Sequence, residues 1–125
     1  MIHYPKVKLL NALSDEFITA GDYEKGMSYA NNSVTLSRQI HFSNGEAAAY
    51  HNIGIIHSSK GDFNKAIEFL LKTLKIREAN NDKEGMAAAL GNIGGIYYAK
   101  DDYDKTLKFF SKTLAIYQEF DNEVV

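Results

Sequence analysis

The chain has 125 residues, of which 45% are hydrophobic, a length and composition typical of one modest globular domain. Its 14 basic and 16 acidic side chains nearly cancel, so no strong overall field draws nucleic acid or an anionic membrane towards it. The sequence contains no cysteine, which excludes disulfide frameworks, thiolate zinc sites and thiol nucleophiles.

The N-terminal stretch MIHYPKVKLL lacks the apolar core of a signal peptide. No window approaches the roughly 18 apolar residues of a membrane-spanning helix. We therefore expect the chain as given to be soluble and to make no direct membrane contact. The compartment stays unknown; the cytoplasm is favoured, and the periplasm is the alternative if the chain is part of a membrane sensor. Pro5 is the single proline, which suits helices better than strands over the rest of the chain.

Two later stretches align without a gap at a spacing of about 40 residues, which indicates an internal repeat. They are HNIGIIHSSKGDFNKAIEFLLKTLKI, from His51, and GNIGGIYYAKDDYDKTLKFFSKTLAI, from Gly91. A weaker copy precedes them, in which the residues 21–23, Gly-Asp-Tyr, match the residues 61–63, Gly-Asp-Phe. We predict one domain, 1–125, built of three units at about 5–44, 45–84 and 85–124.

Each unit is predicted to be a helix hairpin. In the second unit, apolar residues recur at helical spacing over residues 49–56 and again over 63–74. Between these helices, Gly61 can adopt a positive φ and Asp62 can cap the second helix. The polar stretches 41–45 and 80–83 are predicted to link one unit to the next.

The end of the chain resembles a link rather than a polar capping helix, because residues 121–125 align with the link that opens the third unit. Units of this kind stack and share a core, and about three are needed for stability. We therefore expect a fragment of a longer protein, cut at a repeat boundary. Leu107, Phe110 and Leu114 are then shared between the last hairpin and a missing neighbour, and we expect them to leave some apolar surface.

The repeated residues resemble the tetratricopeptide repeat. The second unit supplies its motif as Tyr50, Ile53, Gly54, His57, Gly61, Asp62, Phe63, Ala66, Leu70 and Thr73. The third supplies Leu90, Ile93, Gly94, Tyr97, Asp101, Asp102, Tyr103, Thr106, Phe110 and Thr113. The first, weaker unit supplies Leu10, Leu13, Ser14, Phe17, Gly21, Asp22, Tyr23, Gly26, Ala30 and Ser33.

The resemblance covers nearly the whole chain and implies an all-α fold, a right-handed α-α superhelix, or solenoid, of three helix hairpins. The unit of about 40 residues is similar to those of kinesin light chains, spindle-orientation adaptors and bacterial signalling proteins, including arrays fused to sensor kinases. The resemblance implies a protein–protein interaction module within a larger signalling or scaffold protein. The resemblance also implies that the module binds a peptide segment of a partner in a concave groove lined by the first helices.

Carried over residue by residue, the family's groove positions give the predicted peptide-binding residues. They are Lys8, Asn11, Asp15, His51, Asn52, Gly91, Asn92, Gly95 and Tyr98. Asn52 and Asn92 are the strongest candidates, because an amide can pair with both backbone groups of a bound peptide. The alternative is that these asparagines cap or bridge neighbouring helices.

Three other kinds of site fit poorly. Family members that clamp a C-terminal carboxylate use cations at groove positions that hold Asn11, Ala88 and Asn92 here, so we expect no such clamp. His51 and His57 are not spaced as a metal pair on one helical face; His57 is expected to pack in the core, and His51 to face the groove. No nucleophile and base recur at a plausible spacing, so we expect no enzyme, catalytic residue, cofactor or metal.

The glycines of the stretch GNIGG divide into two kinds. Gly94 matches Gly54 and is expected where the two helices of a hairpin touch. Gly91 and Gly95 match His51 and Ile55, and our hypothesis is that they clear the groove floor beside Asn92 for a ligand. Lysines on the outer helices are interspersed with acids, which favours a solvated face over nucleic-acid contact. The alternative to peptide capture is a structural spacer or self-association element, a homo-oligomer formed through the exposed last helix.

Overall fold

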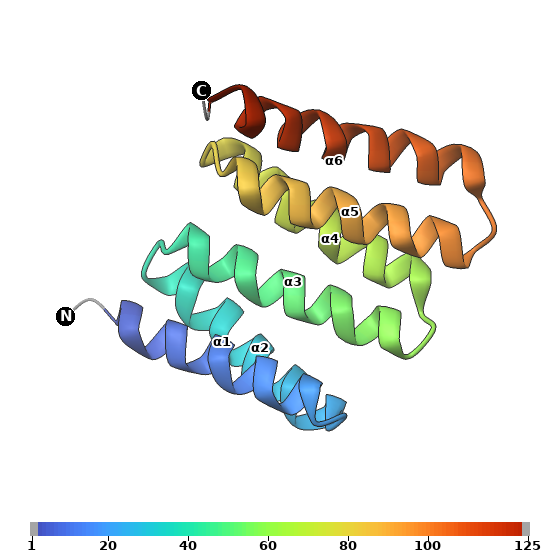
Figure 1. Cartoon of the computed structure of the whole chain (residues 1–125). Coiled ribbons are helices and arrows are strands. Elements are labelled where there is room, and N and C mark those ends of the chain that lie inside the picture. Colours follow the sequence, from blue (N-terminus) through green and yellow to red (C-terminus); the bar gives the residue numbers. More distant parts are fainter. Residues whose placement is uncertain (1–2, 124–125) are drawn as a thin grey trace.

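The computed structural model describes residues 3–123, which form six α-helices and contain no strand. The helices are α1 (Tyr4–Thr19), α2 (Tyr23–Gln39), α3 (Ser43–Ser59), α4 (Phe63–Ala79), α5 (Lys83–Ala99) and α6 (Tyr103–Glu123). They pack as hairpins, α1 with α2, α3 with α4 and α5 with α6, and the hairpins stack through α2 with α3 and α4 with α5. In Figure 1, the first helices α1, α3 and α5 form the nearer layer, with α2 and α4 behind them. The predicted all-α solenoid of helix hairpins is confirmed.

The turns inside the hairpins follow from local sequence. Gly21 and Gly61 adopt φ of 81° and 78°, as the glycine of each Gly-Asp pair predicts, while Asp101 takes the same position with φ of 60°. Asp22 accepts a hydrogen bond from the backbone N–H of Lys25 at 3.1 Å and so caps α2. Asp62 stands at the matching position before α4 without such a bond, and one of its carboxylate oxygens lies 3.7 Å from Nδ1 of His57.

The links between hairpins are shorter than the sequence predicts. Ser43, Asn44 and Gly45 read as turn residues, but they form the first turn of α3. The reason is tertiary: a Cβ at Gly45 would lie 2.5 Å from a methyl of Val7, so α1 and α3 approach closely only because this helical residue has no side chain. Lys83 likewise begins α5 instead of ending a link.

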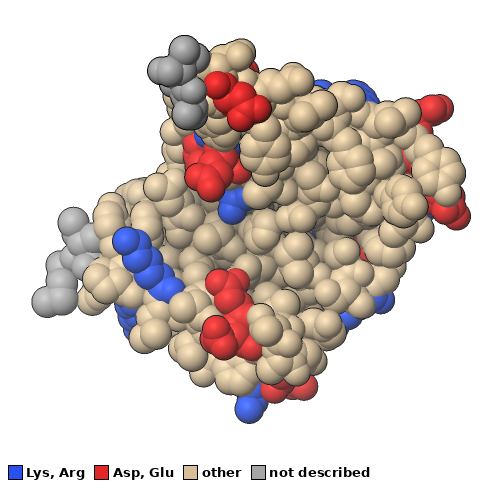
Figure 2. Space-filling model, viewed as in Figure 1, with Lys and Arg blue, Asp and Glu red and all other residues tan. Residues whose placement is uncertain are grey.

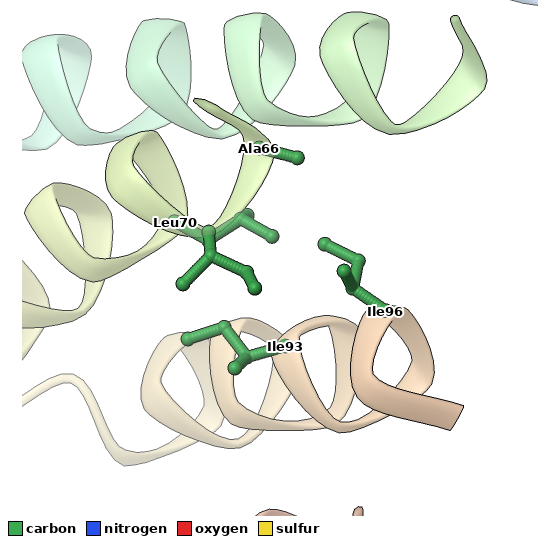
Figure 3. Packing of buried hydrophobic residues seen from close by; sticks show 5 residues of the cluster. Ala66, Leu70, Ile93 and Ile96 are labelled. Atoms are coloured by element: carbon green, nitrogen blue, oxygen red, sulfur yellow. The ribbon is translucent and has the colours of Figure 1, made fainter. Parts of the chain in front are cut away.

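The hydrophobic core continues from one hairpin to the next. Figure 3 shows Ala66 and Leu70 of α4 pointing towards Ile93 and Ile96 of α5, and the most exposed of these residues is 4% exposed. Fully burying a large aliphatic side chain contributes about 1.5–3 kcal/mol, so this contact holds α5 firmly on α4. Because each first helix rests on the preceding second helix in this way, the core fixes where the first helices lie.

Close helix contact inside the hairpins depends on glycine at matching positions. A Cβ at Gly54 would lie 2.9 Å from Cγ of Leu70, and one at Gly94 would lie 2.6 Å from the ring of Phe110. Both distances are too short for an alanine to fit without movement. The expectation that Gly54 and Gly94 mark hairpin contacts is confirmed.

The last helix, α6, is longer than the sequence predicts. Residues 121–123, aligned above with a link, lie inside α6, which runs for 21 residues where the other second helices, α2 and α4, have 17. The third predicted unit ends at residue 124 and the predicted domain at residue 125. Both residues lie outside the described part of the chain. No helix among the described residues is both long and apolar enough to cross a membrane.

Candidate functional site

A pocket opens on the face formed by the first helices, between α1 and α3. It has a volume of about 280 Å³ and is lined by Lys8, Asn11, Ala12, Asp15, Phe42, Asn44, Gly45 and Ala48. Two alanines and a glycine leave its floor shallow and largely apolar, while Lys8 and Asp15 supply opposite charges at its edge. Figure 2 shows this face of the molecule: most of its surface is uncharged, it is hollowed near the centre, and acidic and basic groups are scattered around the hollow.

Two asparagines tie α1 to α3 beneath this pocket. Nδ2 of Asn11 donates to the carbonyl oxygen of Gly45 at 3.2 Å, and Nδ2 of Asn52 donates to the carbonyl oxygen of Asn11 at 3.4 Å. Asn52 is only 6% exposed. Its amide therefore bridges neighbouring helices, the alternative role considered for this residue, and most of its surface is withdrawn from a ligand. Asn11 remains half-buried, in the lining of the pocket.

The corresponding place between α3 and α5 is built differently. The repeat spacing makes Gly85 the counterpart of Gly45, and its carbonyl oxygen accepts a hydrogen bond at 2.9 Å from a guanidinium nitrogen of Arg77, on α4. The hydrogen-bond donor to this carbonyl thus comes from a second helix, α4, whereas the donor to the carbonyl of Gly45 comes from a first helix, α1. Consistent with this change, α1 packs against α3, whereas within residues 3–123 the backbones of α3 and α5 have no comparable contact.

His51 occupies the position in α3 that Asn11 occupies in α1, and its side chain is largely buried. Burial, together with the nearby positive charge of Arg77, lowers the pKa of His51 from 6.5 to about 4, so the ring is neutral at pH 7. Its Nδ1 is shielded from solvent and has no hydrogen-bond partner among the described residues. A neutral imidazole and a cation therefore lie together between α3 and α5.

The remaining predicted residues lie on α5, outside the pocket. Asn92 is half-buried, and within residues 3–123 no hydrogen bond to its side chain is present. A Cβ at Gly95 would meet open space, and one at Gly91 would make ordinary contact with Thr113 of α6 at 3.8 Å. Tyr98, 62% exposed, packs against Tyr103 with ring centroids 5.8 Å apart. The structure thus brings Lys8, Asn11 and Asp15 together but does not gather the α5 residues into their pocket.

Sequence reasoning missed three contributors to this face. Phe42 and Asn44 line the pocket from the segment read as a link, and Arg77 lies in the last turn of a helix assigned to the outer layer. The alignment of the units could have pointed to Arg77, because the first unit has the small, uncharged Ser37 at the matching position. His57, in contrast, packs as expected: it is half-buried and stacks on Phe69 with ring centroids 5.7 Å apart.

Comparison with solved structures gives the fold. The TPR domain of Arabidopsis FLU matches with a TM-score of 0.83 at 19% identity, over 92% of this chain and 97% of that chain. BtubC (BKLC) from P. vanneervenii matches with a TM-score of 0.81 at 20% identity, over 92% of this chain and 48% of its own, so this chain spans about half the length of BtubC. A putative kinesin light chain from Podospora anserina matches with a TM-score of 0.75 at 15% identity, over 93% of this chain and 57% of that chain.

Comparison with protein families gives the same result from sequence. No curated protein matches the chain significantly. Two tetratricopeptide repeat models match it, one over residues 9–79 and the other over residues 86–119. The first match alone covers more than half of the chain, which therefore belongs to the tetratricopeptide repeat family, whose members are generally protein–protein interaction modules.

Proposed function

We propose that this chain captures a peptide segment of a partner protein on the face formed by α1, α3 and α5. The observation that carries the proposal is the pocket between α1 and α3, about 280 Å³ in volume, with three of the predicted groove residues in its lining. A pocket of this size suits one or two side chains of a peptide, since it lies at the lower end of the roughly 300–1,000 Å³ of sites that hold small ligands.

The lining indicates what such a peptide carries. Ala12, Gly45 and Ala48 provide a floor that an apolar side chain covers, and Phe42 provides an aromatic wall. Lys8 and Asp15 attract opposite charges on either side of that side chain, which fixes the direction of the peptide. Asn11 holds this floor in place, because its Nδ2 donates to the carbonyl oxygen of Gly45 and so ties α1 to α3.

Selection from a phage-displayed library of 12-residue peptides tests the proposal. A selected peptide is synthesised, and its affinity is measured by calorimetry for the wild type and for Lys8→Glu, Asp15→Lys and Ala48→Trp. We expect each variant to lose at least about tenfold in affinity, because it reverses a charge or fills the pocket. Lys65→Glu, a charge reversal at an exposed position of α4, is the matched control and should bind as the wild type does. Equal affinity in all five proteins would overturn the proposal.

A second candidate function, self-association, is favoured by the outer face of α6. Leu107, Phe110 and Leu114 are 65%, 43% and 56% exposed, although their counterparts in α4, which α5 covers, are at most 9% exposed. At the other end of the stack, Leu9 of α1 is 60% exposed, whereas its counterparts Ala49 and Ala89 are fully buried. The exposed face of α6 thus corresponds to the face of α4 that α5 covers, and the exposed face of α1 corresponds to faces that are buried in α3 and α5. We therefore propose that α1 of a second copy packs on α6.

Light scattering over a concentration series tests self-association. We expect the mass to rise with concentration, because a contact between unlike ends does not close and adds further copies. Leu107→Asp with Leu114→Asp should hold the chain monomeric, since it places charge in an apolar contact. A monomer at millimolar concentration would rule this candidate out and leave peptide capture intact.

A further inference from the structure

We propose that the gap between α3 and α5 is a receptor for one carboxylate of the captured peptide, with Arg77 as its principal ligand and His51 beside it. This inference rests on the proposed function and names the chemistry of the peptide. Arg77 lies in the last turn of α4. It is not at one of the groove positions where some family members carry a cation; those positions hold uncharged residues in this chain.

The first step of the argument is that the charge of Arg77 has no direct ion-pair partner. Among the described residues, no carboxylate oxygen lies within 4.0 Å of its guanidinium nitrogens. Asp82 is the acid that acts on it electrostatically, and the Oδ1 atom of Asp82 already accepts the backbone N–H of Gly85 at 2.9 Å. A half-buried cation without a paired anion is costly, and a ligand anion relieves that cost.

The second step is that Arg77 has donors to spare. A guanidinium carries five N–H groups in a planar fork, and here a hydrogen bond to the carbonyl oxygen of Gly85 uses one nitrogen. The buried polar atoms that lack a partner include none from Arg77, so its remaining N–H groups are reachable from solvent. A carboxylate is the anion that matches two N–H groups of this fork side by side.

The third step is that the first helices beside Arg77 are held less closely than α1 and α3 are. The α3 and α5 backbones are not in close contact here, unlike α1 and α3, which two asparagines tie together. His51, neutral at pH 7, feels the positive charge of Arg77 and adds no second charge beside it; its Nδ1 is shielded from solvent, so Arg77 is the group that holds the anion. Gly85, whose carbonyl oxygen accepts the hydrogen bond from Arg77, lies in the first turn of α5.

The proposal is tested by NMR titration of the wild-type chain with three small probes. N-acetyl-glutamate N-methylamide presents a side-chain carboxylate, N-acetyl-alanine presents a C-terminal carboxylate, and N-acetyl-glutamine N-methylamide presents neither. The signals followed are the Nε–H of Arg77, the ring of His51 and the amide of Gly85. We expect saturable shifts at all three with at least one carboxylate and none with the glutamine probe, and the two carboxylates show which source the gap accepts.

Variants separate this site from general charge effects. Arg77→Gln should abolish the saturable shifts of His51 and Gly85, and Arg77→Lys should weaken binding several-fold, because lysine keeps the charge but loses the fork. The matched control is Arg38→Gln, which removes an arginine from the last turn of α2 and should leave the titration unchanged. Shifts that persist in Arg77→Gln, or that the glutamine probe produces equally, would overturn the proposal, as would the absence of any shift in the wild type.

Failure of this inference can be told apart from failure of the proposed function. A library peptide that binds through Lys8 and Asp15, with an affinity that Arg77→Gln does not change, would leave the proposed function standing and this inference overturned.

Discussion

At the scale of single residues, one difference between two similar units changes what lies between their first helices. Where the first unit has Ser37, fully buried, the second has Arg77, whose long side chain reaches α5. A Cβ at Gly85 would lie 2.7 Å from Cδ of Arg77, so the arginine stem packs directly against the first turn of α5. A cation and a histidine therefore lie between α3 and α5, where asparagine amides bridge α1 and α3.

The histidine gives the chain a predictable dependence on pH. The pKa of His51 is about 4 in the folded state against 6.5 for an unperturbed histidine, because burial and Arg77 disfavour its charged form. Between these pH values the unfolded chain binds more protons, so stability rises with pH. The contribution of His51 is complete above pH 6.5 and is lost as the pH falls towards 4, by up to about 3 kcal/mol.

Urea unfolding from pH 4 to 7.5 measures this contribution. His51→Gln removes the titrating group, and Arg77, the charged group that acts on His51, is retained in both proteins. We expect the free energy of unfolding to fall more steeply for the wild type than for the variant as the pH drops below 6.5. Parallel profiles would show that His51 titrates normally in the folded state.

The glycines of α5 give a second prediction at this scale. Gly95→Ala should stabilise the chain by about 1 kcal/mol, because its Cβ meets open space and alanine favours a helix. Gly91→Ala should act in the same direction, and Gly94→Ala in the opposite one, since its Cβ would collide with Phe110. Urea unfolding of the three variants checks the signs. If Gly91 and Gly95 clear the groove floor, the first two variants also weaken binding of the selected peptide.

At the scale of helices, the asparagines of α3 and α5 occupy matching positions but have different surroundings. Asn52 holds a carbonyl oxygen of α1, whereas Asn92 is half-buried and makes no such bond within the described residues. The sequence predicted both as peptide ligands, with helix bridging as the alternative. The geometry of Asn52 fits the bridging role, and Asn92 stays a candidate for ligand contact.

Paired alanine substitutions separate these two roles. Asn52→Ala should lower the free energy of unfolding by about 1 kcal/mol, because it removes the side-chain hydrogen bond that ties α3 to α1. Asn92→Ala should leave stability nearly unchanged and weaken binding of the selected peptide. Thermal unfolding and calorimetry on the same two proteins check this. Equal loss of stability in both variants would make Asn92 structural as well.

The helices and their internal turns were predictable because their signals are local. Gly61 reaches its positive φ, and apolar residues at helical spacing in α4 meet those of α5. The start of α3 was not predictable from the sequence, because Ser43, Asn44 and Gly45 are typical turn residues. Their helical conformation depends on packing against Val7 of α1, which is distant in the sequence. Arg77 was missed for the same reason: its role depends on Gly85 and His51, which only the folded stack brings near it.

At the scale of the whole molecule, three hairpins of similar sequence give a face with two different halves. The half between α1 and α3 has an apolar pocket with charges at its edge, and the half between α3 and α5 has a cation and a neutral imidazole. If both proposals hold, a peptide that crosses the two halves places an apolar side chain between α1 and α3 and a carboxylate at Arg77. The repeat provides the shared frame, and the residues that depart from it make the two halves chemically different.

The most direct test of peptide capture is a chemical-shift map of the selected peptide bound to the isotope-labelled chain. We predict that the largest changes fall on α1, α3 and α5, at Lys8, Asn11 and Asp15 and at Asn92, with little change at Lys65 and Lys75 on the exposed side of α4. Changes concentrated on the exposed residues of α6, with those groove residues unmoved, would contradict it.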